Sequence, residues 1–157
     1  MELGMILALF GAALAVVLAG IGSSVGIGYA AQASNGVMTE EPEKFTSLLI
    51  LSVLPGTQGI YGFVGAFFVM LKVGLLGTTL TVTPAQGWQI LGACLPVGIA
   101  GLFSGIHQGK VSASGVAVVA KQPQEFMKSV IFSALVETYA VLGLLITILL
   151  LMGIQVG

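Results

Sequence analysis

The run SVIFSALVETYAVLGLLITILLLM, residues 129–152, decides the fold class, because it is almost wholly apolar and carries a single charged residue, Glu137. An apolar run of about 20 residues is typical of a transmembrane helix. An acid in the middle of such a helix costs roughly 2.5–3.5 kcal/mol on insertion scales, and it is typically retained to handle ions or protons, or it is paired inside a helix bundle. The run therefore predicts a membrane-spanning helix in which Glu137 carries the chemistry.

The composition of the whole chain indicates the same environment. Of its 157 residues, 57% are hydrophobic and 7% are charged, and the mean hydropathy is +1.10. A soluble domain carries about 25% charged residues, so a water-soluble globular enzyme is excluded. The five basic residues are scattered lysines, which speaks against a nucleic-acid partner. One cysteine and one histidine are too few to ligate zinc or an iron–sulfur cluster.

Hydropathy predicts an all-α membrane protein with four transmembrane helices, at about residues 3–32, 43–76, 85–118 and 124–155. Polar or proline-containing segments separate these spans. Four of the five lysines lie at or near the first and third connections. By the positive-inside rule, the loops at 33–42 and 119–124 are expected to be cytoplasmic, and both termini are expected outside a multi-pass cell-membrane protein.

An internal repeat organises the four spans. A shift of about 81 residues places Pro42, Phe45, Ser52, Thr57 and Gly62 on Pro123, Phe126, Ser133, Thr138 and Gly143. We therefore expect one helical hairpin, duplicated in tandem in the same orientation, with halves at residues 1–76 and 77–157. Inverted-repeat transporters place their halves in opposite orientations, which disfavours that class. The acid Glu137 aligns with Gly56, so the duplicated chain keeps one intramembrane acid for four helices.

Polar residues of two other spans are expected to gather around this acid. Thr57, Gln58 and Tyr61 share one helical face, since neighbours three and four positions apart lie together on a helix. Gln108 adds an amide from the third span. Hard cations prefer oxygen ligands, and we extend this rule to Na⁺. Because a proton needs only the carboxylate, the extra oxygens favour Na⁺, with H⁺ as the competing ion; interhelical hydrogen bonding is the alternative role for these polar groups.

Two further features of the spans have packing explanations. Pro55 removes a backbone donor and is expected to free the carbonyl of Leu51, which either offers an oxygen to an ion or reflects a packing kink. We interpret His107 as a helix-packing residue. Glycines at four-residue spacing predict close helix contacts, at Gly22 and Gly26 in the first span and at Gly101, Gly105 and Gly109 in the third.

Three stretches resemble a known family. LPGTQGIYGF (54–63), GLFSGIHQGK (101–110) and VETYAVLG (136–143) are similar to the proteolipid subunits of V-type ATPases, in particular to subunit K of the bacterial sodium-pumping type. The resemblance implies a ring of identical four-helix subunits that forms the rotor of the membrane sector. It also implies a non-catalytic, ion-translocating subunit, with ATP hydrolysis in other subunits of the complex.

The same resemblance implies roles for individual residues. Glu137 would be the ion-carrying carboxylate, Tyr61 would hydrogen-bond to it, and the Na⁺ ligands would be Glu137, Thr57, Gln58, Gln108 and a main-chain oxygen of Leu54. The main-chain oxygen differs from the one expected from Pro55 alone, which belongs to Leu51. The implied partners are a stator membrane subunit with a basic residue, a central-stalk subunit at the cytoplasmic loops, and lipid.

Two other classes of membrane protein stay open from the residues themselves. A small oligomeric four-helix antiporter would use Glu137 as its coupling acid, but it would surround a substrate cation with aromatic residues, which are few near this acid. A passive pore would show several polar residues along one helix, whereas the first span is mostly glycine, alanine and aliphatic residues. The glycine- and alanine-rich helices favour close packing in a ring.

Overall fold

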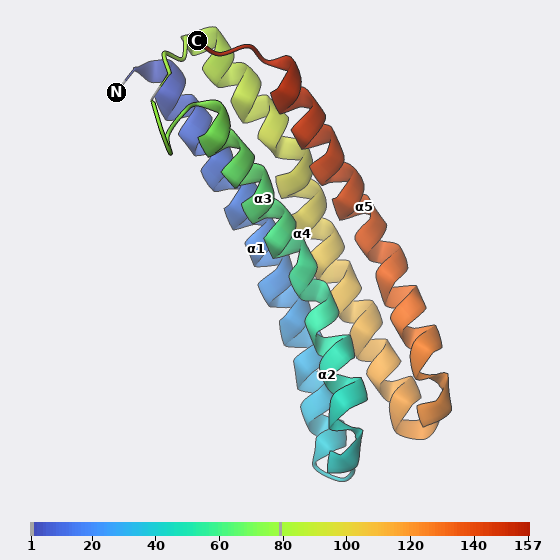
Figure 1. Cartoon of the computed structure of the whole chain (residues 1–157). Coiled ribbons are helices and arrows are strands. Elements are labelled where there is room, and N and C mark those ends of the chain that lie inside the picture. The colour runs from blue at the N-terminus through green and yellow to red at the C-terminus, as the bar shows by residue number, and fades with distance from the viewer. Residues whose placement is uncertain (1, 79) are drawn as a thin grey trace.

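The computed structural model describes residues 2–78 and 80–157; Met1 and Thr79, which fall in the first and second predicted halves, lie outside the described residues. Throughout that part of the chain the regular structure is helical, and it includes four helical segments long and apolar enough to cross a membrane, at Leu3–Met38, Pro42–Lys72, Pro84–Lys121 and Pro123–Gly153. They lie side by side as an elongated bundle, with both chain ends at the same end (Figure 1). The predicted all-α, four-helix membrane fold is confirmed.

The four spans are built from eight helical elements. These are α1 (Leu3–Met38), η1 (Pro42–Lys44), α2 (Phe45–Val53), η2 (Leu54–Gly56), α3 (Thr57–Lys72), α4 (Pro84–Lys121), η3 (Pro123–Glu125) and α5 (Phe126–Gly153). The second arm of each hairpin begins with a short 3₁₀ turn at a proline, Pro42 or Pro123, because proline suits the first position of a helix. The interrupted second span, α2–η2–α3, is the counterpart of the unbroken α5.

The predicted span limits differ most from the structure at the ends of the first and second spans. The first helix continues to Met38 instead of ending near residue 32, because Ser34 is buried there and its hydroxyl lies 2.9 Å from the Ser52 hydroxyl of α2. The polar pair makes the end of α1 part of the bundle. The second span ends at Lys72 instead of residue 76, and Gly74 follows with a φ of +69°, the left-handed conformation that commonly terminates helices.

The closest helix contact joins the two hairpins. α1 packs along α4, α3 packs on α1, α5 packs on α4, and α3 also contacts α4 and α5. A Cβ built on Gly22 would lie 2.4 Å from the carbonyl oxygen of Gly101, and one on Gly26 would lie 2.2 Å from that of Gly105. Such distances leave no room for a side chain, so the predicted role of these glycines in close packing is confirmed.

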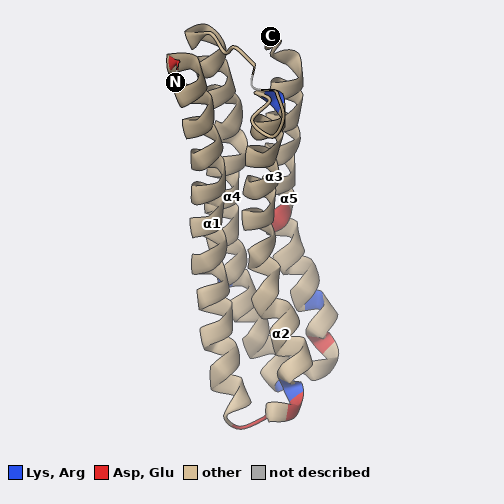
Figure 2. Ribbon diagram, turned by 60° about the vertical axis from the view of Figure 1, so that its left-hand side comes forward, with Lys and Arg blue, Asp and Glu red and all other residues tan. Residues whose placement is uncertain are grey.

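Charged residues gather at the end of the bundle that holds the connections before α2 and α5 (Figure 2). Lys44 pairs with Glu41 and also donates to the carbonyl oxygen of Ala120 at 2.6 Å, while Lys128 pairs with Glu125. The first and third connections therefore lie at the same end and are tied together. This arrangement is compatible with the predicted cytoplasmic loops, whose sidedness stays a prediction.

Candidate functional site

The break in the second span positions the first group of polar residues. Helix α2 ends at Val53, the 3₁₀ turn Leu54–Gly56 contains Pro55, and α3 restarts at Thr57. The Thr57 hydroxyl donates to the carbonyl oxygen of Leu54 at 3.1 Å. Two main-chain oxygens, those of Leu51 and Leu54, are candidates from the sequence. The oxygen of Leu54 is the one that accepts this hydrogen bond from Thr57, a predicted site residue.

A neighbouring hydroxyl supports this restart, although the sequence pattern assigned it no role. Ser23 of α1 is buried, and its oxygen accepts the backbone N–H of Gly59 at 2.7 Å. This N–H belongs to the first turn of α3, where donors lack intrahelical acceptors. The serine thereby holds the start of α3 against α1, and the only sign of it in the sequence is a pair of serines, Ser23 and Ser24, among glycines.

Two glutamines connect α3 and α4 to the acid on α5. Gln58 and Gln108 are both fully buried, and the Gln58 side-chain nitrogen donates to the Gln108 side-chain oxygen. The Gln108 nitrogen in turn donates to one carboxylate oxygen of Glu137 at 3.3 Å. The Tyr61 hydroxyl donates to the other carboxylate oxygen at 2.5 Å. The structure thus brings together residues that are up to 83 positions apart in the sequence, from Leu54 to Glu137.

The acid lies far from the charged end of the bundle. Figure 2 shows one acidic position midway along α5, and Glu137 is the only acid of that helix. Its side chain is half-buried. Among the described residues, the ion pairs are Lys44–Glu41 and Lys128–Glu125, so the partners of Glu137 are neutral hydrogen-bond donors. A structural salt bridge therefore does not account for this acid.

The charge and donor atoms of the site limit which ion could bind there. Within residues 2–78 and 80–157, no three His, Cys, Asp or Glu residues come close enough to share a metal. The Glu137 carboxylate accepts hydrogen bonds from Gln108 and Tyr61, and the oxygens of Leu54, Thr57, Gln58 and Gln108 belong to the hydrogen-bonded chain that leads to it. One negative charge is balanced by a monovalent cation or a proton, whereas a divalent cation would leave an uncompensated charge in an apolar span. One carboxylate among neutral groups is therefore compatible with a monovalent cation or a proton.

Comparison with known proteins identifies the family of this chain. A model of the family formed by the C subunits of ATP synthases matches residues 10–69 and 91–150, once in each hairpin. The chain belongs to this family. The two matches agree with the predicted tandem duplication, although the boundary between residues 76 and 77 itself stays a prediction.

Named relatives of this family are similar over most of the chain. The V-type sodium ATPase subunit K of Enterococcus hirae is 48% identical over 96% of this chain and 93% of its own length. The A-type ATP synthase subunit K of Methanocaldococcus jannaschii is 41% identical over 98% of this chain, which spans 65% of that relative. The 16 kDa proteolipid of the V-type proton ATPase of Nephrops norvegicus is 31% identical over 89% of this chain and 86% of its own length.

These relatives confirm the resemblance to V-type ATPase proteolipids. Members of this family are ion-translocating, non-catalytic membrane subunits, with ATP hydrolysis in other subunits, and V-type proteolipids assemble into rings. The chain is a multi-pass membrane protein of this kind, and the antiporter alternative fits less well. The relatives include components of both sodium and proton ATPases, so membership of the family does not by itself decide whether the transported ion is Na⁺ or H⁺.

Proposed function

We propose that this chain is a rotor-ring subunit of a rotary V-type ATPase that binds Na⁺ at Glu137 and carries it across the membrane. One observation carries the proposal: both carboxylate oxygens of Glu137 accept hydrogen bonds from neutral side chains of two other helices, in the middle of an apolar bundle. Such an arrangement supports a carboxylate that alternates between an ion-bound and an ion-free condition.

Charge balance supplies the mechanism. An ionised carboxylate is costly to expose to lipid, whereas a carboxylate with bound Na⁺ is neutral overall. A subunit with a loaded site can therefore pass the lipid-facing rim of a turning ring. A subunit with an ionised, empty site is stabilised only beside a positive charge, which we assign to a basic residue of a stator subunit. Rotation driven by ATP hydrolysis in other subunits then moves ions in one direction.

Each neutral residue would make a different contact with the ion or with the carboxylate. Each glutamine side chain ends in one oxygen and two N–H donors, so Gln58 and Gln108 can each contact a cation through oxygen while their nitrogens hold neighbouring acceptors. Thr57 and the Leu54 carbonyl add two oxygens at the helix break. Tyr61 donates to Glu137 and fixes the carboxylate orientation. This number of neutral oxygens exceeds what a proton carrier needs and supports Na⁺ as the cargo.

The ends of the bundle suggest the remaining partners. The loops that contain the Lys44–Glu41 and Lys128–Glu125 pairs form one polar end, and we place this end in the cytoplasm by the positive-inside rule. A central-stalk subunit would contact it there. Both chain ends would then lie outside.

Carbodiimide labelling tests the ion and its carboxylate together. These reagents attack a protonated carboxyl group, so bound Na⁺, which keeps Glu137 ionised, should protect it at neutral pH. We expect labelling of Glu137 that falls as Na⁺ is added, while K⁺ at equal ionic strength protects weakly. Glu137→Gln should remove the labelling, which shows that the loop acids do not contribute. Labelling that is indifferent to Na⁺ would favour H⁺ as the cargo.

A further inference from the structure

Two buried serines, which we call the serine pair, join α4 to α5 beside the candidate site. Ser112 and Ser133 are fully buried, and their hydroxyl oxygens lie 2.7 Å apart, so one hydroxyl donates a hydrogen bond to the other. Ser112 is four positions after Gln108, and Ser133 is four positions before Glu137. The serine pair therefore lies about one helical turn, roughly 6 Å, from the contact between these two side chains.

Few other hydrogen bonds hold α4 and α5 together near this depth. Among the described residues, apart from the contact with Glu137 and the serine pair, the hydrogen bond between these helices runs from the Val97 N–H to the Thr147 hydroxyl, at 3.2 Å. Thr147 is ten positions beyond Glu137 on α5, which corresponds to about 15 Å. The serine pair is therefore the hydrogen bond between α4 and α5 that lies close to the carboxylate without involving it.

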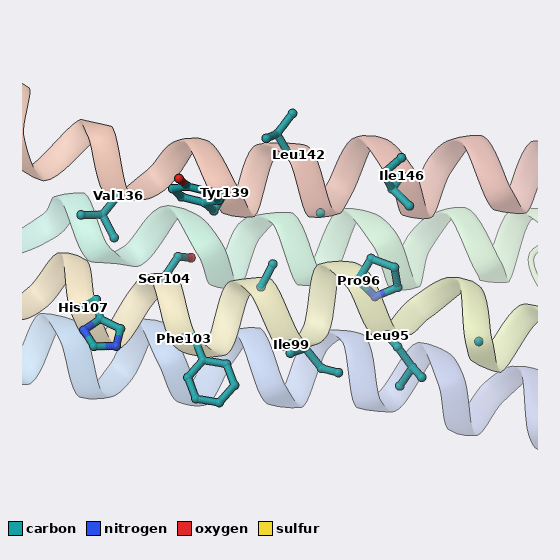
Figure 3. Close-up of a pocket in the computed structure, with 13 residues that line it drawn as sticks. Leu95, Pro96, Ile99, Phe103, Ser104, His107, Val136, Tyr139, Leu142 and Ile146 are labelled. Atoms are coloured by element: carbon teal, nitrogen blue, oxygen red, sulfur yellow. The ribbon is translucent and has the colours of Figure 1, made fainter.

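One side of the contact between α4 and α5 is open at the depth of the site. His107 of α4 and Val136 and Tyr139 of α5 help to line an apolar groove of about 830 Å³ (Figure 3). His107 directly precedes Gln108, and Val136 directly precedes Glu137. Within one chain, packing on this side therefore does not fix the distance between the two helices where the site residues meet.

Toward the polar end of the bundle, the two helices lie very close together. A Cβ built on Gly115 would lie 2.8 Å from the Cβ of Ser129, which leaves no room for a side chain. Small residues let helix backbones approach, and hydrogen bonds between polar side chains then hold them together. The serine pair lies between this close contact and the carboxylate, so it fixes the helix distance on the side of the site that faces the polar end.

The contact beside the serine pair is sensitive to the distance between the helices. The Gln108 nitrogen lies 3.3 Å from a carboxylate oxygen of Glu137, just beyond the usual range of about 2.7–3.2 Å for such a bond. A small further separation of α4 and α5 would break it. The geometry of the site therefore depends on what keeps the two helices at their present distance.

The first hairpin contains a second hydroxyl pair, which lacks this relation to the acid. Ser34 of α1 and Ser52 of α2 are buried, with their oxygens 2.9 Å apart, and Ser52 also donates to the Leu48 carbonyl at 2.8 Å. By the repeat, Ser52 is the counterpart of Ser133. The side chains that bond to Glu137 come from α3 and α4, and neither α1 nor α2 supplies one among the described residues. The Ser34–Ser52 pair is therefore a matched control.

We propose that the serine pair sets the width of the ion site and thereby its preference for Na⁺ over a larger cation. This role rests on the proposed function and makes Ser112 and Ser133 positioning residues, which act through Gln108 and Glu137. Selectivity among hard cations depends on the size of the cavity and the flexibility of its ligands. A cation is held by oxygens of both helices at once, whereas a proton binds to the carboxylate alone. A bond that fixes α4 against α5 therefore favours a cation of one size and leaves proton binding unchanged.

Removing the two hydroxyls singly and together tests this role. Ser112→Ala and Ser133→Ala each break the same hydrogen bond, and Ser112→Ala/Ser133→Ala breaks it without leaving an unpaired buried hydroxyl. Because residues that share one hydrogen bond are coupled, the effects of the single variants should not add in the double variant. The control is Ser34→Ala/Ser52→Ala, which removes the buried pair of the first hairpin. Native mass spectrometry establishes that the rings are intact.

Cation binding at Glu137 is measured on purified rings as protection against carbodiimide labelling. The Na⁺ concentration for half-protection should rise about tenfold in all three variants, at the low end of the effect of groups that support metal ligands. The K⁺ concentration should rise less, because a site that can widen discriminates less against the larger ion. Labelling without added cation, at the same pH, should match that of the parent rings, since the carboxylate still accepts a proton. The control variant should match the parent throughout.

Unchanged Na⁺ protection and an unchanged ratio of K⁺ to Na⁺ in the double variant would overturn this role. Effects of the single variants that add in the double variant would also overturn it, as would an equal loss in the Ser34→Ala/Ser52→Ala control. If a single variant fails to assemble, the double variant decides by comparison with the parent. Parent rings that show no Na⁺ protection would instead refute the proposed cargo, and this role with it, before any variant is compared.

Discussion

Replacing Gln108 by leucine tests the proposed ion site most directly, because this side chain joins two others. It is fully buried, accepts a hydrogen bond from Gln58, and donates one to Glu137 at 3.3 Å. Leucine has a similar size, so Gln108→Leu removes one amide oxygen and two hydrogen bonds with little change in packing volume. The carboxylate itself remains able to accept a proton.

The size of the effect follows from these contacts. Loss of a supporting group at a metal site typically lowers affinity 10–100-fold, which corresponds to about 1.4–2.8 kcal/mol. The buried Gln58 nitrogen also loses its acceptor, and an unpaired buried donor costs about 1–3 kcal/mol. We therefore expect the Na⁺ dissociation constant to rise 10–100-fold. Protons should then displace Na⁺ at a higher pH than in the parent protein, because the substitution lowers the affinity of the site for Na⁺ and not its affinity for protons.

The assay is ²²Na⁺ binding to purified rings over a pH series, after native gels have established that the rings are intact. Gln124→Leu is the matched control, since Gln124 is exposed in the η3 turn, far from Glu137 along the chain. Unchanged Na⁺ affinity in Gln108→Leu would refute the assignment of this residue as a ligand. Its buried amide would then serve only to hold α3, α4 and α5 together.

A further prediction concerns topology. Cysteines at Glu40 and Gln122, placed in a chain with Cys94→Ala, should resist an impermeant thiol reagent in intact cells and react in inverted vesicles; labelling from outside would reverse the orientation.

The helical spans, and the side chains that gather around Glu137, could be predicted from the sequence, because the chain has few polar residues within its spans. A chain with 7% charged residues leaves an intramembrane acid conspicuous. The helical period then places Thr57, Gln58 and Tyr61 on one face, and the structure places that face toward Glu137. The repeat also singles out Glu137, because this acid is a difference between two otherwise similar hairpins.

The details that could not be predicted depend on contacts between helices. Ser34 is a polar residue of the kind found in loops, yet it lies inside α1 because Ser52 of the neighbouring helix satisfies its hydroxyl. Similarly, Pro55 indicates a break without indicating the hydrogen bonds made there, and in the structure the Thr57 hydroxyl donates to the carbonyl oxygen of Leu54. Hydropathy and spacing contain no information on a pairing such as that of Ser34 with Ser52, which lie 18 positions apart.

The duplicated hairpins have diverged so that one of them carries the acid. All the proposed ligands, from Leu54 to Glu137, belong to one chain and lie where its two hairpins pack together, where small residues allow close contact. In the repeat, Gly56 stands at the position that corresponds to Glu137, and Tyr139 stands at the position that corresponds to Gln58. Under the proposed function, each chain therefore carries one ion, at the acid that only its second hairpin retains.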